Sequence, residues 1–338
     1  MKRQPRFVPY GSGPLSAQGR RALWTLVEPS LTDICQSLEL GHFVRARRIE
    51  RGSHHLVWRV HTGEGVYALR PCARTGREAA TRHASRERLW TTVGQWEVAP
   101  RYRGSQRLHM NEFDGWIEAF DWIDGRPLRP AADHRPLART LAWLHGRSPG
   151  GAKNTVPEVS LQPFLQTELR GYLRRNRDGG SVKPLLRSRT LAALSSLEDC
   201  GPSSVKPRLV HNDLVDGNVL SQRGRVWLID WDWAMITSPV VDLFCFLSPF
   251  VRSWGGQPRF LTEKVAKGFL AAYSAERGKG HTARILRSDG AFWVPYNTLL
   301  ANWLYHEPLG MPHTTNAAFY RRAFAEVERL GEVIAAFK

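Results

Sequence analysis

The feature that most constrains this chain is the stretch from Leu209 to Asp232, in which two apolar runs alternate with two clusters of polar side chains. The apolar runs are short and rich in Val, Leu and Ile, which is typical of buried strands. The polar residues are His211, Asp213 and Asn218 in the first cluster and Asp230 and Asp232 in the second. This stretch therefore predicts a pair of buried strands with a cluster of polar, potentially catalytic side chains at one end.

The residues between the two runs, Ser-Gln-Arg-Gly at 221–224, predict the turn of a β-hairpin. Such a hairpin would bring Asn218 and Asp230 near each other at its open end, beside Asp213. Two carboxylates and an amide at the end of an apolar hairpin suit a divalent cation and a phosphate chain.

The pattern His-x-Asp-x-x-x-x-Asn, followed by Ile-Asp, resembles the catalytic and metal-binding segments of kinases. The form found here, HNDLVDGNVL with LIDWDWA, is similar to the aminoglycoside phosphotransferase, choline kinase and thiamine kinase-like superfamily. Protein kinases differ, because they have Arg after the His and Phe-Gly after the metal-binding Asp. The resemblance implies an α+β, bilobal, protein-kinase-like fold, with a small N-lobe of one antiparallel sheet and one helix and a larger, mostly helical C-lobe.

The resemblance also implies a role for each matched residue. Asp213 would accept or orient the proton of the substrate hydroxyl, and His211 would brace the loop. Asn218 and Asp230 would hold Mg²⁺ on the phosphates of ATP. Further along, Ser-Pro-Val-Val-Asp-Leu at 238–243 is similar to a family segment in which the acid, here Asp242, starts a helix and braces the catalytic loop. His145, which ends the helix predicted from Asp133, is expected to be structural.

The predicted N-lobe holds the nucleotide-binding positions that the resemblance implies. Gly52 and Ser53 match the loop that covers the phosphates, although this loop has a single glycine. Arg70 ends the run Val-Tyr-Ala-Leu-Arg, where kinases usually place a lysine for the α- and β-phosphates. The following helix offers Glu78 and Glu87 as partners of Arg70, and the spacing to the later proline favours Glu87.

The segment Trp-Ile-Glu-Ala-Phe-Asp-Trp-Ile-Asp-Gly at 116–125 resembles the hinge between the lobes of this superfamily. Adenine would bind there through backbone groups of Asp121 and Ile123. We therefore expect a flexible leader at 1–20, an N-lobe at 21–123 and a C-lobe at 124–338.

The acceptor is predicted to be a small-molecule alcohol, and a choline- or thiamine-type cation is the first candidate. Asp232 and the late aromatic helix with Trp303 and Glu307 would suit such a cation, although an aromatic stripe at helical spacing also fits a core. Aminoglycosides are the alternative acceptors. An inactive, kinase-like binding protein is the alternative of another class, because the loop has one glycine and the lysine is absent.

Composition argues against a nucleic-acid-binding, a membrane-spanning or a disulfide-rich protein. The chain has 338 residues and a net charge of +17, but its basic residues are scattered, so nucleic-acid binding is not expected as the main function. No apolar run reaches the roughly 18 residues that a membrane helix needs. The four cysteines lie far apart, which favours a reducing cytoplasm over a disulfide framework. The pattern does not indicate an oligomeric state.

Overall fold

The computed structural model describes residues 25, 27–49, 56–73, 79–110, 113–175, 182–254, 258–306 and 315–337. The chain forms two compact units. The first contains Met1–Arg126, Asn154–Val156 and Trp227–Trp233, and the second contains Pro127–Lys153, Pro157–Val226 and Ala234–Lys338. Asp230 and Asp232 therefore group with the first unit, whereas Asp213 and Asn218 group with the second.

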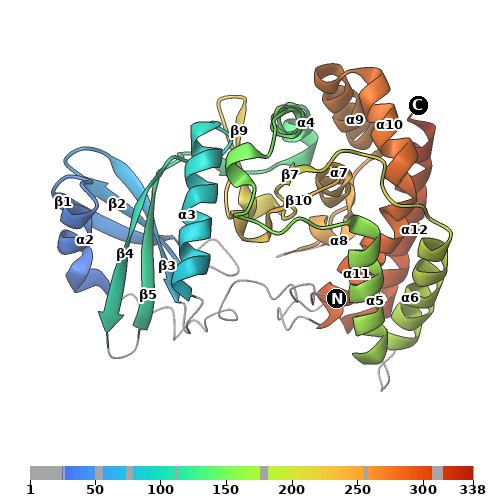
Figure 1. Ribbon diagram of the computed structural model, residues 1–338, viewed down its shortest axis with the longest axis horizontal. Coiled ribbons are helices and arrows are strands. Elements are labelled where there is room, and N and C mark those ends of the chain that lie inside the picture. The colour runs from blue at the N-terminus through green and yellow to red at the C-terminus, as the bar shows by residue number, and fades with distance from the viewer. Residues whose placement is uncertain are drawn as a thin grey trace. The chain divides into compact units, whose positions relative to one another are not determined.

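The first unit is built on a five-stranded sheet with the order β1-β2-β3-β5-β4, in which every neighbouring pair is antiparallel (Figure 1). The strands are β1 (Phe43–Ile49), β2 (Val57–Thr62), β3 (Val66–Ala73), β4 (Tyr102–Met110) and β5 (Phe113–Asp121). A short 3₁₀ turn (Glu28–Ser30) and α2 (Leu31–Ser37) precede the sheet, and α3 (Ala79–Gln95) lies between β3 and β4.

The two faces of this sheet have different chemistry because side chains alternate along each strand. One face packs against α2 and forms a closed apolar core that includes Leu31, Ile34, Trp58, Leu69 and Ile117. The other face carries polar residues, among them Arg70 and Glu118, and α3 contributes side chains to it. The sheet therefore has one structural face and one face available for chemistry.

The second unit is mostly helical. Its helices are α4 (Pro130–Gly146), α5 (Leu161–Arg175), α6 (Lys183–Glu198), α7 (Val240–Leu247), α8 (Pro249–Arg252), α9 (Glu263–Arg277), α10 (Lys279–Asp289), α11 (Trp293–His306) and α12 (Ala317–Ala336). Helix α7 is buried along its whole length, and apolar residues fill all but one of its positions, so it forms the centre of this unit. The short 3₁₀ turns of this unit in the described ranges are Gly150–Ala152, Asp216–Asn218 and Gly290–Phe292, and the turn Trp231–Trp233 belongs to the first unit.

The predicted hairpin is confirmed. Strands β8 (Val219–Gln222) and β9 (Arg225–Leu228) pair in a three-stranded sheet with β6 (Arg126–Pro127), in the order β6-β8-β9. The turn residues Arg223 and Gly224 have φ values of 48° and 79°, as a two-residue hairpin turn requires. Just before the hairpin, β7 (Arg208–Val210) pairs antiparallel with β10 (Met235–Thr237) and supports the loop that begins at His211.

The expected α+β architecture is confirmed, with a small antiparallel sheet followed by a larger helical part. The first unit contains the short helix α2 before the sheet in addition to α3. None of the helices in the described ranges is both long and apolar enough to cross a membrane.

Candidate functional site

The loop that carries Asp213 is fixed by a buried carboxylate. Asp242, in the first turn of α7, accepts hydrogen bonds from the backbone N–H groups of His211 (3.0 Å) and Asn212 (2.7 Å). Asn212 has a φ of 61°, a left-handed conformation that Asn tolerates better than most residues. The predicted bracing role of Asp242 is thus confirmed, and the two bonds set the direction in which the chain enters the loop.

A second layer holds Asp242 in place. His145, at the end of α4, contacts the same Asp242 carboxylate through Nε2 (3.0 Å) and the hydroxyl of Tyr273 through Nδ1 (2.9 Å). His145 is fully buried, so this network is part of the core, as its predicted structural role requires.

Asp213 is held by two residues of its own motif. The amide nitrogen of Asn218 donates to the Asp213 carboxylate (2.7 Å) and to its carbonyl oxygen (3.1 Å). The Asp213 N–H in turn donates to Nδ1 of His211 (3.2 Å), which is the contact expected of a residue that braces the loop. The three residues that match the family motif therefore form one connected group.

The far side of the loop is anchored by Arg252, which the sequence analysis missed. This guanidinium, at the end of α8, donates to the Leu214 carbonyl oxygen and pairs with the Asp216 carboxylate. Arg252 is buried, and desolvation lowers its pKa, whereas Asp216 acts in the opposite direction. Arg252 thus ties the Leu214 backbone and the Asp216 side chain, on either side of Val215, to helix α8.

Asp213 lines a small cavity with an aromatic wall. The cavity has a volume of about 20 Å³, and its lining consists of Asn212, Asp213, Val215, Cys245, Phe250, Val251, Trp254, Leu300 and Trp303. The rings of Trp254 and Trp303 lie 5.0 Å apart. Burial raises the pKa of the Cys245 thiol to about 12, so this cysteine stays protonated and is not a nucleophile. The structure therefore brings Trp303, one of the predicted substrate residues, together with Asp213.

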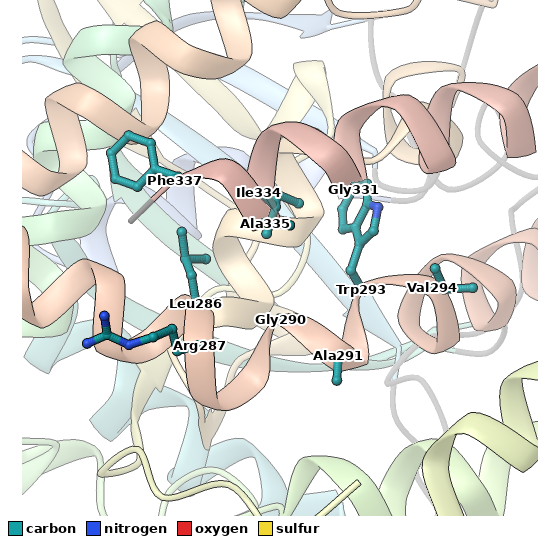
Figure 2. A pocket seen from close by; sticks show the side chains of 10 residues that line it. All are labelled: Leu286, Arg287, Gly290, Ala291, Trp293, Val294, Gly331, Ile334, Ala335 and Phe337. Carbon is teal, nitrogen blue, oxygen red and sulfur yellow. The ribbon is translucent and has the colours of Figure 1, made fainter. Parts of the chain in front are cut away.

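A larger cavity of about 410 Å³ lies elsewhere in the second unit, between α10, the start of α11 and the end of α12 (Figure 2). Its lining includes Leu286, Val294 and Ile334, and Trp293 packs closely under Gly331. None of the predicted site residues lies there, so this cavity is not the candidate site.

In the first unit, the polar face of the sheet holds a buried cluster of two arginines and three acids. Arg70 donates through Nε to Glu118 (2.9 Å) and through Nη1 to Asp230 (3.0 Å), and its Nη2 lies 3.5 Å from Asp232. Burial would lower the pKa of Arg70, but Glu118, Asp232 and Asp230 together hold it well above its usual value. Arg70 is therefore a permanent cation that is surrounded by carboxylates.

Helix α3 contributes the second cation of the cluster. Arg86 pairs with Asp232 and lies 3.8 Å from Glu118, and its guanidinium sits 4.5 Å from the centre of the Trp90 ring. In the kinase pattern this helix supplies a glutamate and the strand supplies the cation. Here the helix supplies an arginine, and the strand β5 supplies the acid.

The predicted pairing of Arg70 with Glu87 is wrong. Glu87 accepts hydrogen bonds from the hydroxyl groups of Tyr102 and Ser105, and Arg70 pairs with Glu118 instead. The physical reason is strand register, since Arg70 on β3 lies directly opposite Glu118 on β5 and the two side chains share a face. A signal was available, because Glu118 is the one charged residue in the apolar run from Trp116 to Phe120. Glu78, the other candidate, lies outside the described residues.

Asp230 and Asp232 have different environments from those expected. Asp230 has a φ of 62°, and such left-handed strain in a non-glycine residue is often found at functional sites. The side chain of Asp232 is 5% exposed and faces two guanidinium groups. Asp232 is therefore part of the ion-pair cluster with Arg70 and Arg86, and the structure does not support the prediction that it binds a cationic substrate.

The structure describes only some of the other residues that were predicted to bind the nucleotide. The Asp121 N–H donates to the Arg101 carbonyl oxygen, so an adenine contact at Asp121 would have to use its own carbonyl oxygen. Ile123 follows directly after β5 and Trp122. Gly52, Ser53 and Glu307 lie outside the described residues, and their roles stay predictions.

The residues that would hold magnesium have suitable donor atoms. Asn218 uses its amide nitrogen on Asp213, which leaves its oxygen as the ligand atom that a hard cation takes. In the described ranges no three His, Cys, Asp or Glu side chains form a metal cage. Magnesium is usually held by one or two carboxylates together with substrate phosphates, so a cage is not needed. The expected proximity of Asn218 and Asp230 stays a prediction.

Comparison with solved structures agrees with this fold. The chain is similar to macrolide 2′-phosphotransferase MphH from Brachybacterium faecium, with 20% identity, a TM-score of 0.53 and coverage of 90% of this chain and 97% of that one. It is also similar to choline kinase from Cryptosporidium parvum, with 13% identity, a TM-score of 0.59 and coverage of 93% and 96%. A spectinomycin phosphotransferase solved with ADP and spectinomycin matches with 14% identity, a TM-score of 0.54 and coverage of 90% and 98%.

At these identities the solved structures show a shared fold. The sequence itself carries the family assignment, because the model of the phosphotransferase enzyme family matches residues 45–284. That range includes the Asp213 loop, its brace Asp242 and the Arg70 cluster. The chain belongs to the phosphotransferase enzyme family.

Proposed function

We propose that this chain transfers the γ-phosphoryl group of ATP to a hydroxyl group of a small molecule. The observation that carries the proposal is the Asp213 loop. Its catalytic carboxylate is fixed by Asn218 and by the Asp242 brace, and it lines a cavity in which an acceptor hydroxyl could reach it. A carboxylate that is held in place in the lining of a cavity is what a phosphotransferase needs to orient an attacking hydroxyl.

In this proposal Asp213 takes the proton of the acceptor hydroxyl as the oxygen attacks the γ-phosphorus. The bonds from Asn218 and the Asp242 brace keep the carboxylate in one rotamer, so little reorganisation is needed in the transition state. Magnesium, with Asn218 and Asp230 as its protein ligands, would neutralise charge on the phosphates. The ADP in the spectinomycin phosphotransferase structure supports the use of an adenine nucleotide.

The lining of the Asp213 cavity favours an acceptor with a single cationic group. Within the described lining, Asp213 is the only carboxylate, and the aromatic rings of Phe250, Trp254 and Trp303 make up the wall. Aromatic faces bind a quaternary ammonium group through cation–π attraction. An aminoglycoside carries several ammonium groups and would need more acids than this lining offers. We therefore propose a choline- or thiamine-type alcohol and keep aminoglycosides as the second candidate.

The cavity is smaller than either acceptor, so an acceptor must displace part of its wall. At about 20 Å³ it has room for roughly one water molecule. Trp254 and Trp303 are half-buried, so their side chains can move at a lower cost than the buried Phe250 and Leu300. Substrate binding should therefore change the environment of these two indoles.

Tryptophan fluorescence and turnover test the proposal together. Choline, thiamine and a kanamycin-type amine are each added to the protein with ATP and Mg²⁺, and ADP release is recorded. The proposal expects acceptor-dependent ADP release with one of the first two and a change of indole emission that is lost in Trp303→Phe. If only the kanamycin-type amine produced ADP release, the acceptor would be reassigned to aminoglycosides. If no acceptor in a broader panel of alcohols produced ADP release, an inactive binding protein would be favoured.

A further inference from the structure

Four basic side chains of the second unit form a group that the functions assigned above do not use. Arg208 begins β7, Arg277 ends α9, and His281 and Arg284 lie in the first two turns of α10. Helix α10 follows α9 directly in the chain (Figure 1). The described lining of the Asp213 cavity includes none of the four, so the group is separate from that cavity.

Two of these guanidinium groups meet at the carboxyl end of α4. Arg208 donates through Nε to the carbonyl oxygen of His145 (2.9 Å), and a Cβ placed on Gly146 would lie 2.9 Å from Nη1 of Arg277. The carboxyl end of a helix carries partial negative charge, which explains why two cations can approach it. Because that partial charge amounts to only about half an elementary charge, most of the positive charge of the group remains.

The group lacks a carboxylate that could compensate the rest. In the part of the chain that the structure describes, no Asp or Glu forms an ion pair with any of the four side chains. The charged and titratable groups that act on His281 are all basic, and together with burial they lower its pKa: Arg277, Arg284, Arg208 and His145. Burial and Arg277 likewise lower the pKa of Arg208. The cations therefore repel one another without an opposing charge between them.

The contacts of His281 indicate that an acceptor is missing from the group. Nη2 of Arg277 lies 3.0 Å from its Nε2, and Nη2 of Arg284 lies 3.0 Å from its Nδ1. A guanidinium nitrogen can only donate, and a neutral imidazole has a single acceptor nitrogen, so at least one contact sets two donors face to face. The Nε of Arg277 is also buried and has no hydrogen-bond partner within the described residues. Because buried donors without an acceptor cost free energy, the arrangement fits a missing anion.

The chemistry of the donors favours a tetrahedral oxyanion over a carboxylate. Guanidinium groups bind phosphate oxygens in pairs, and a dianion offsets the excess charge better than a monoanion does. The first turn of α10 adds further donors, because its N-cap, Gly278, has no side chain that could accept from the N–H groups of that turn. An anion with several acceptor oxygens would separate the crowded donors and give each of them a partner.

We infer that Arg208, Arg277, His281 and Arg284 form a binding site for a phosphate group, carried by a soluble phosphomonoester or by a lipid headgroup, and that His281 binds it as the imidazolium. The anion favours the charged ring, so binding takes up a proton wherever the free ring is neutral. The affinity is therefore highest below the pKa of the free ring and falls as the pH rises through the higher pKa of the occupied site. This site does not depend on the proposed phosphotransferase function.

Proton NMR of the histidine rings in the full chain tests the inference, with sulfate as the probe because it stays a dianion throughout the titration. The His281 signal is the one that is absent from His281→Gln. Sulfate should raise the pKa of this signal relative to chloride at the same ionic strength, since screening is then equal.

Three variants separate a built site from general positive charge. Arg277→Gln should weaken sulfate binding roughly tenfold or more, because it loses a charge-assisted hydrogen bond. Arg284→Ala, an exposed change that leaves the core intact, should cause a smaller loss. The matched control is Arg189→Ala, which removes an arginine of the same unit that is already paired with Glu328 (2.7 Å) and should leave the affinity unchanged.

Two further arms identify the source of the phosphate group. Glycerol 3-phosphate is titrated in solution, and vesicles of phosphatidic acid in phosphatidylcholine are sedimented with the protein. Binding in either arm that Arg284→Ala weakens and Arg189→Ala does not would support the site and name its source. A His281 pKa that sulfate leaves unchanged would overturn the inference, and so would an affinity that is the same in the wild type and in both site variants. No arm measures turnover, so a chain that phosphorylates no acceptor would leave this result unaffected.

Discussion

The substitution Glu118→Gln tests the charge cluster of the first unit most sharply. It keeps the size of the side chain and removes the negative charge that lies between two buried guanidinium groups. Glu118 accepts from Arg70 at 2.9 Å and lies 3.8 Å from Arg86, and its side chain is fully buried. Water cannot replace the lost charge, so the two arginines must share the remaining carboxylates.

The size of the effect follows from these contacts. Leaving a buried charge without any partner costs about 3–5 kcal/mol. Arg70 keeps Asp230 at 3.0 Å, so the loss should be closer to one charge-assisted hydrogen bond, about 2–3 kcal/mol in the free energy of unfolding. Because Arg70 also positions Asp230, the KM for Mg²⁺·ATP should rise roughly tenfold, which corresponds to about 1.4 kcal/mol.

Urea denaturation gives the free energy of unfolding, and initial rates at varied Mg²⁺·ATP give the KM. The matched control is Glu87→Gln. Its carboxylate accepts from Tyr102 and Ser105 and is partly exposed, and the amide oxygen of Gln can still accept, so its cost should stay below about 1 kcal/mol. If Glu87→Gln cost more than Glu118→Gln in stability and in KM, the assignment of Glu118 as the partner of Arg70 would be refuted.

Further variants test the loop and the cavity. Asp213→Asn should lower kcat by about 10²–10⁴-fold with ATP affinity unchanged in calorimetry, and a variant with more than a tenth of wild-type turnover would remove Asp213 as the base. Asp230→Ala should abolish the gain in ATP affinity that Mg²⁺ produces, and an unchanged gain would place the metal elsewhere. Asp242→Asn should destabilise the chain by about 1–3 kcal/mol in urea and lower kcat, because one loop N–H loses its acceptor; wild-type values for both would deny its bracing role. Trp303→Ala should raise the acceptor KM and leave the ATP KM unchanged, whereas the reverse pattern would contradict an acceptor site at this cavity.

The residues of the Asp213 loop could be predicted because their chemistry is local in the sequence. Asp213 and Asn218 are five positions apart, and a short loop forces their side chains together whatever the rest of the chain does. The role of Asp242 was predicted from the resemblance of the segment 238–243 to the family, and the structure places its carboxylate on the loop N–H groups. The hairpin followed from its turn residues.

The partners of Arg70 could not be predicted in this way, because they depend on strand register. The spacing to the later proline pointed to Glu87, but strand register placed Arg70 opposite Glu118 on a strand far along the chain. Arg252 was missed because its partners are a carbonyl oxygen and Asp216, and neither leaves a pattern in the sequence. Contacts between charged residues far apart in the sequence could therefore not be predicted from local patterns.

The most direct test of phosphoryl transfer is a ³¹P NMR time course of the wild type and Asp213→Asn with Mg²⁺·ATP and the acceptor panel. If the account is right, the wild type converts ATP to ADP and one new phosphate monoester in equal amounts, with one acceptor of the panel, and Asp213→Asn forms the ester at least a hundredfold more slowly. A wild type that forms no ester with any acceptor, or an Asp213→Asn variant that forms it at the wild-type rate, would contradict the account.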